Sequence, residues 1–182
     1  MKTFQVMCCA MTLAVGLTIS STANASSIDF DCDTVPDHFS TVSQKVDGHA
    51  LTLSGSLRVV QKRSGRYLPL AGVLLSPVDT ALGRDFIGFP IVASKDDAAT
   101  SEVTFRDHSS ANSIKALNRY PDAGDKSFSL SLSDSGVLTL TLGADVFTMN
   151  APRSAKWPRV RVDIMCSTGQ FKFFNTTLAL SG

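Results

Sequence analysis

The chain has 182 residues, with 17 basic and 16 acidic side chains and a formal net charge of +1. A protein that binds nucleic acid or an anionic membrane through its overall charge carries a basic excess, so this balance argues against both partners. The length suits one domain with a proper hydrophobic core.

The first 25 residues show the three-part pattern of a cleavable secretory signal peptide. Lys2 provides the basic start, an apolar run covers residues 4–19, and residues 23–25 form an A-x-A triplet. Signal peptidase needs small side chains at the two alanine positions, which predicts cleavage after residue 25. The alternative is a membrane anchor, but the apolar run is shorter than the ~20 residues that span a bilayer. We therefore expect an exported protein, periplasmic or extracellular, with residues 26–182 as one domain without a transmembrane segment.

The positions of the cysteines predict one disulfide. Cys8 and Cys9 lie in the apolar run of the leader, so Cys32 and Cys166 are the two that remain after cleavage. An even pair in an oxidising compartment predicts a bridge, which would bring the first and last strands of the domain together. Two buried free thiols are the alternative.

Alternation of apolar and polar residues with a period of two dominates the rest of the chain. This pattern predicts strands with one buried face and one face in water. The clearest hairpin joins residues 127–132 to residues 137–142 through a Ser-Asp-Ser-Gly turn. A second hairpin is predicted from residues 57–61 to residues 67–75. Further strands are expected at residues 51–59, 86–93, 102–106, 160–166 and 171–180.

Evidence for helices is thin. Residues 109–118 are expected to form one short helix or none, and residues 119–126, with Pro121 and Gly124, are expected to form an exposed loop. Residues 150–158 form a second long connection. About ten short strands with turns at this spacing predict an all-β fold, an antiparallel two-sheet β-sandwich, rather than a parallel sheet with helices.

Three segments follow one another as an opening strand, a strand pair around a glycine turn, and a closing strand. They are residues 28–31 (IDFD), residues 128–143 (FSLSLSDSGVLTLTLG) and residues 169–178 (GQFKFFNTTL). In this order they resemble the concanavalin A-like (laminin-G-like) jelly-roll family, over most of residues 28–180. The resemblance implies a jelly roll whose last strand returns beside the first. The family includes sugar-binding lectins, glycoside hydrolases and adhesive modules, so it implies no single function.

Catalytic motifs are absent from the sequence. Hydrolases of the jelly-roll family carry a Glu-x-Asp-x-x-Glu motif, whereas this chain has a single glutamate, Glu102. No Gly-x-Ser-x-Gly elbow occurs, and the three histidines stand apart from one another. We therefore predict a protein that is not an enzyme, with a hydrolase built on an aspartate pair as the less favoured alternative.

Metal-ligand patterns are weak. Three scattered histidines and a cysteine pair that is predicted to form a disulfide do not provide a zinc site. Asp29, Asp31 and Asp33 alternate near the start of the domain, and Asp122 and Asp125 share a loop, so their oxygens would suit Ca²⁺. No single segment supplies the six or more ligands that Ca²⁺ takes. We expect no cofactor, with Ca²⁺ as the alternative.

Aromatic side chains with polar neighbours provide the candidate ligand-binding residues. Arg119, Tyr120 and Asp122 lie close together in a segment predicted to be a loop, and a loop with these residue types suits recognition. Trp157 lies in a second proline-flanked connection, and Tyr67 is the third candidate aromatic residue. For Trp157 a place in the core is the favoured interpretation, because tryptophan buries a large apolar area. For Tyr120 both roles stay open.

Three basic residues, Lys62, Arg63 and Arg66, form the tip of the second predicted hairpin. A solvated turn is the favoured interpretation, and a contact with an anionic ligand is the alternative. Taken together, the sequence predicts an exported binding module whose partner is a glycan. The alternative is a structural or protein–protein interaction component of the cell envelope.

Overall fold

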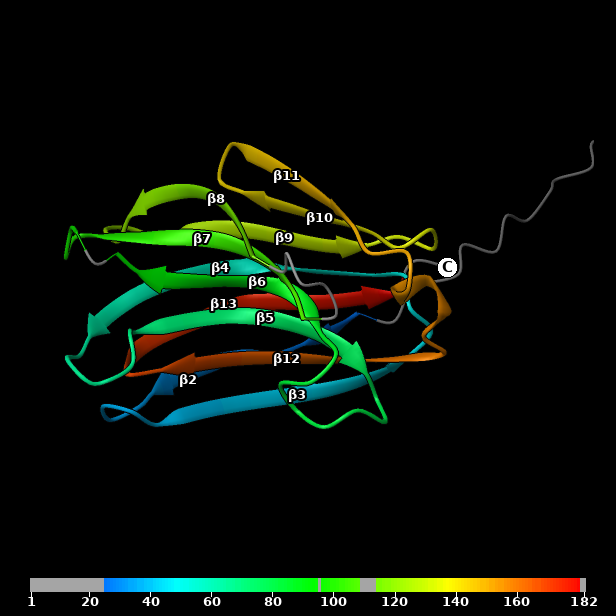
Figure 1. The fold of residues 1–182 in the computed structure, drawn as a ribbon, viewed down its shortest axis with the longest axis horizontal. Coiled ribbons are helices and arrows are strands. Elements are labelled where there is room, and N and C mark those ends of the chain that lie inside the picture. The colour runs from blue at the N-terminus through cyan, green and yellow to red at the C-terminus, as the bar shows by residue number, and fades with distance from the viewer. Residues whose placement is uncertain (1–24, 95, 109–113, 181–182) are drawn as a thin grey trace, which may run out of the picture.

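The computed structural model describes residues 25–94, 96–108 and 114–180, which form a sandwich of two antiparallel sheets. Figure 1 shows the six-stranded sheet in front of the seven-stranded sheet. The seven-stranded sheet contains β1 (Ser26–Ser27), β2 (Phe30–Asp33), β4 (Leu51–Lys62), β9 (Lys126–Leu132), β10 (Val137–Leu142), β11 (Asp145–Asn150) and β13 (Gly169–Leu180). The six-stranded sheet contains β3 (Phe39–Asp47), β5 (Leu70–Pro77), β6 (Ile87–Ala93), β7 (Thr100–Asp107), β8 (Ile114–Pro121) and β12 (Arg159–Ser167).

The order of strands in each sheet confirms the predicted all-β fold. The seven-stranded sheet runs β1-β13-β4-β9-β10-β11, with β2 also paired to β13, and the six-stranded sheet runs β3-β12-β5-β6-β7-β8. One 3-10 turn, η1 (Ser154–Lys156), is the only helical element among the described residues. No helix in the described ranges is long and apolar enough to cross a membrane. Residues 1–24 of the predicted leader lie outside the described residues.

Alternating side chains of the two sheets meet in a single core. Leu53, Leu130 and Phe173 point inward from the seven-stranded sheet, and Val73 and Phe89 do so from the six-stranded sheet, all less than 2% exposed. Each such side chain stabilises the fold by roughly 1.5–3 kcal/mol through its buried apolar area. Aromatic rings connect the two layers, since the rings of Phe89 and Phe128 lie 5.9 Å apart.

The first predicted hairpin is confirmed and the second is wrong. β9 pairs with β10 in antiparallel register: Leu132 lies opposite Leu138 and Phe128 opposite Leu142. Gly136 in their turn has a φ of 76°, which favours glycine. The segment of residues 63–69, however, does not fold β5 back onto β4. It crosses from one sheet to the other, so that β4 pairs with β9 and β13 while β5 pairs with β6 and β12.

The segment predicted as a short helix and a loop contains a strand. Residues 114–121 form β8, which pairs with β7 at the edge of the six-stranded sheet. Residues 109–113, where the short helix was expected to begin, lie outside the described residues. The predicted loop of residues 119–126 is therefore shortened to residues 122–125, between β8 and β9.

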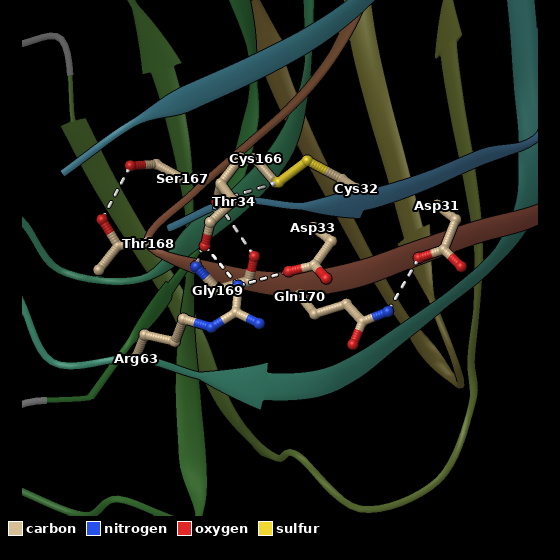
Figure 2. The surroundings of a disulfide bond; sticks show 10 residues. All are labelled: Asp31, Cys32, Asp33, Thr34, Arg63, Cys166, Ser167, Thr168, Gly169 and Gln170. Atoms are coloured by element: carbon tan, nitrogen blue, oxygen red, sulfur yellow. Dashed lines mark hydrogen bonds and ion pairs between the residues drawn. A yellow bond between two sulfur atoms is a disulfide. The ribbon is translucent and has the colours of Figure 1, made fainter. Parts of the chain in front are cut away.

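The predicted disulfide between Cys32 and Cys166 is present and joins the two sheets (Figure 2). Cys32 lies on β2 of the seven-stranded sheet and Cys166 on β12 of the six-stranded sheet. Their Cα atoms are 6.2 Å apart, and the two residues are 1% and 0% exposed. The bridge therefore closes one end of the sandwich, close to where β12 turns into β13 and the chain changes sheet.

Candidate functional site

A cleft of about 720 Å³ opens at the end of the sandwich where β4 ends, which lies at the left in Figure 1. We call it the end cleft. The end of β4 and the crossing segment form one side, and the β6–β7 connection and the residue after β8 form the other. Its lining consists of Val59, Val60, Gln61, Lys62, Arg63, Ser64, Gly65, Tyr67, Leu68, Pro69, Ala93, Ser94, Ala98 and Asp122.

Lys62 and Asp122 form an ion pair that connects the two sheets across the end cleft. Lys62 Nζ lies 2.5 Å from Asp122 Oδ2, and both side chains are only about one-sixth exposed. The same ammonium donates hydrogen bonds to the carbonyls of Ala98 (2.9 Å) and Thr100 (2.7 Å), which uses all three of its donors. Ser101 Oγ donates to Asp122 Oδ1 at 2.6 Å. The carboxylate is therefore held at a fixed position in the lining.

Arg63 fixes the crossing segment to the strand that carries the disulfide (Figure 2). Its guanidinium donates to Asp33 Oδ1 and to the carbonyl of Thr34, both at 2.5 Å, and to Gln61 Oε1 at 2.9 Å. Of the three basic residues predicted to form a solvated turn, Lys62 and Arg63 are thus tied to acidic partners. Arg66 remains exposed.

Large apolar side chains also line the end cleft. Tyr67, Val60 and Leu68 are 46%, 43% and 38% exposed, and they belong to the few large apolar side chains exposed in the described ranges. The guanidinium carbon of Arg66 lies 4.8 Å from the centre of the Tyr67 ring. Asp37 Oδ1 accepts the Tyr67 backbone N–H at 2.8 Å, which fixes the segment that presents the ring. The cleft thus combines a partly exposed aromatic ring with hydrogen-bonding groups.

Arg119 and Tyr120 lie on β8 rather than in a loop. Arg119 pairs with Glu102 on β7 at 2.6 Å. The Tyr120 hydroxyl donates to Asp145 Oδ2 at 2.5 Å, and Asn118 donates to the same oxygen at 3.1 Å, which ties the edge of one sheet to the edge of the other. Burial, followed by the hydrogen bond to Asp145, raises the pKa of Tyr120 to about 12. This tyrosine therefore has a structural partner.

Trp157 is buried, as its favoured interpretation predicted, and it is 6% exposed. It follows η1 at the right-hand end of Figure 1, whereas Asp122 follows β8 at the left-hand end. The guanidinium carbon of Arg153 lies 5.7 Å from the centre of the Trp157 ring. The four residues predicted to bind a ligand are therefore not gathered in one place. Their role in binding stays a prediction, and Asp122 alone lines the end cleft.

Local sequence could identify part of the end cleft. The basic tip and Tyr67 stand out in the sequence, but Gln61 and Ser94 carry no such signal. These residues come together because residues 63–69 pass from one sheet to the other. The local pattern of residues 57–75 predicted a hairpin instead, so the lining could not be assembled from the sequence.

The aspartates considered for Ca²⁺ have protein partners. Asp31 accepts from Lys172, and this hydrogen bond holds the pKa of Asp31 below its usual value. Asp33 pairs with Arg63 and Asp125 with Arg58, while Asp29 accepts the backbone N–H of Thr176 at 3.1 Å. Among the described residues, no group of three or more His, Cys, Asp or Glu side chains could hold a metal ion.

No protein-family model matches the chain, and no curated protein matches it. Solved structures do match it. An alginate lyase from Pseudomonas aeruginosa has a TM-score of 0.55 at 11% identity, over 74% of this chain and 68% of the lyase. The potassium-bound carbohydrate recognition domain of Emp46p has a TM-score of 0.55 at 15% identity, over 83% and 82%. A structure of the endo-acting O-glycanases that human gut microbiota express to initiate mucin breakdown has a TM-score of 0.56 at 9% identity, over 79% and 74%.

At identities this low, the matches show the fold alone. In fold, they confirm the resemblance to the concanavalin A-like jelly rolls. They also correct one prediction. The inference that the protein is not an enzyme is not supported, because this fold is shared by carbohydrate recognition domains, alginate lyases and O-glycanases. The missing Glu-x-Asp-x-x-Glu motif concerns one class of hydrolase and does not exclude other chemistry.

Proposed function

We propose that the protein binds a glycan in the end cleft. Tyr67 would stack on the apolar face of a sugar ring, and Gln61, Arg63 and Asp122 would contact its hydroxyl groups. The observation that carries this proposal is the half-exposed Tyr67 ring, which shares one open cleft with fixed charged and amide groups. Ligand sites in proteins commonly combine such apolar surface with a few placed polar groups.

The fold neighbours support a glycan rather than another ligand class. These neighbours are an alginate lyase, a carbohydrate recognition domain and an O-glycanase of mucin breakdown. Recognition of sugar is common to all three, so the proposal concerns binding. We also propose that the protein is exported, which the leader pattern and the disulfide support.

A glycan array probed with the purified protein, followed by calorimetry on each hit, tests the proposal. Tyr67→Ala is expected to weaken binding about tenfold, or ~1.4 kcal/mol, because stacked aromatic side chains commonly supply the strongest contacts. Val146→Ala is the matched control, since Val146 is 63% exposed on β11 and does not line the end cleft.

Two results would contradict the proposal: an array without hits, or a hit whose affinity is unchanged by Tyr67→Ala. Fluorescence of Trp157 is not a suitable readout, because this residue is buried away from the end cleft.

A further inference from the structure

A second, apolar pocket of about 230 Å³ lies on the outer face of the six-stranded sheet. The β5–β6 connection, residues 78–86, loops back across this face and forms the roof (Figure 1). Arg161 holds the connection to the sheet by donating to the carbonyl of Thr80 at 2.7 Å, and Asp85 pairs with Arg153. The lining residues are Phe39, Leu70, Leu74, Leu82, Gly83, Phe86, Pro90, Arg106 and Met165.

Two of the lining residues, Leu74 and Arg106, lie on either side of a glycine in the sheet. Leu74, Gly88 and Arg106 are direct neighbours across β5, β6 and β7. A Cβ atom at Gly88 would lie 2.1 Å from the carbonyl oxygen of Val73, so the sheet accepts only glycine there. The glycine lets β5 and β6 approach closely between these two residues, and Leu82 of the roof lines the same pocket.

Arg106 is the one charged residue in this lining, and its charge is not compensated by the described part of the chain. Its Nε is buried without a hydrogen-bond partner, and no ion pair involving it occurs among the described residues. The neighbouring Asp107 belongs to the opposite face of β7 and pairs with Arg153 at 2.6 Å. Asp163, on the same sheet face, is already bound by Arg161 and Ser43.

Arg106 is half-buried, and a guanidinium nitrogen that is buried without an acceptor is unfavourable unless a ligand supplies one. We propose that the pocket binds a small amphiphilic carboxylate, whose carboxylate accepts hydrogen bonds from Arg106 and whose apolar body lies over Leu74, Pro90 and Met165. At ~30 Å³ for a water-sized group, 230 Å³ holds about eight such groups, which corresponds to a short alkyl chain. This site is separate from the end cleft and does not depend on the proposed glycan binding.

Calorimetry with three probes tests both parts of the ligand. Octanoate carries the chain and the charge, 1-octanol carries the chain alone, and acetate carries the charge alone. We expect octanoate to bind more tightly than either of the others. Arg106→Gln is expected to weaken octanoate about tenfold or more, since hydrogen bonds to charged groups are strong, and to leave 1-octanol unchanged.

Arg159→Gln is the matched control, because Arg159 lies on β12 of the same sheet, outside the lining, and pairs with Asp47 at its rim. Circular dichroism of each variant establishes that it is folded. Leu82→Ala, at a 56% exposed roof position, is a second variant with little effect on packing, and it should weaken both octanoate and 1-octanol.

Methyl NMR locates the ligand. The Met165 methyl signal should shift on addition of octanoate, whereas that of Met149 on β11 should not. Failure of octanoate to bind would overturn the proposal. Equal binding of octanoate and 1-octanol, equal loss in Arg106→Gln and Arg159→Gln, or a shift confined to Met149 would do so as well.

Discussion

Removal of the disulfide between Cys32 and Cys166 is expected to destabilise the fold by about 3–5 kcal/mol. The two cysteines are 134 residues apart in the sequence. In the chain-entropy model, a cross-link over a loop of this length removes about 5 kcal/mol of unfolded-state entropy at 25 °C, and native bridges commonly deliver somewhat less. A single domain has an unfolding free energy of roughly 5–15 kcal/mol, so this bridge supplies a large part of it.

Urea unfolding of the oxidised protein and of the C32A/C166A variant measures this contribution. The midpoint should fall, and the m-value should rise, because the unfolded chain without its cross-link exposes more surface. C32A alone should have the same midpoint and m-value as the double variant, since either change removes the bridge. Both cysteines are buried, so reductant should act only after the protein opens. A loss below about 1 kcal/mol with an unchanged m-value would refute an effect through the unfolded chain.

Substitutions at three single positions test other parts of the structure. The pKa of Tyr120 is raised to about 12, so its stabilising contribution is complete below its ordinary value of 10 and is lost as pH rises from 10 to 12. Y120F should therefore flatten the fall in melting temperature over that range, and an unchanged slope would contradict this. Trp157→Ala should lower the unfolding free energy by about 3–5 kcal/mol in urea, and a loss near zero would contradict its burial. Gly88→Ala should lower it by about 1–3 kcal/mol, because its Cβ would meet the Val73 carbonyl, and unchanged stability would show that the strands can separate there.

Strands in the interior of the sheets could be predicted from sequence, and several at the edges could not. β9 and β10 have neighbours on both sides, so their inward residues alternate without interruption and the hairpin was predicted correctly. β3, β8 and β11 were not predicted, and each lies at the edge of a sheet. An edge strand pairs on one side only and buries less surface. In β8, only Leu117 and Tyr120 pack against the core, and their neighbours in the strand are exposed. The sequence of β8 therefore shows no regular alternation of apolar and polar residues.

The incorrect hairpin has a different cause. Residues 57–61 and 67–75 both alternate, and a glycine-containing turn lies between them, so the local pattern fits a hairpin. The same pattern fits a crossing between two sheets, because each strand needs only one inward face in either arrangement. The choice depends on distant partners: β4 pairs with β9 and β13, which follow it by more than sixty residues.

The grouping of the residues that line the end cleft could not be predicted from the sequence for the same reason. Lys62 and Asp122 are separated by sixty positions and lie on different sheets, so they meet only when the sandwich closes. Asp122 was selected because Arg119 and Tyr120 are its neighbours in sequence, yet those two residues pair with Glu102 and Asp145 instead. In a two-sheet fold, residues adjacent in sequence alternate between faces, whereas a cleft at the end of the sandwich collects residues from several strand ends. Sequence neighbours are therefore poor guides to such a site, whereas the exposed Tyr67 ring and the Lys62–Asp122 pair, which line one cleft, identify it in the structure.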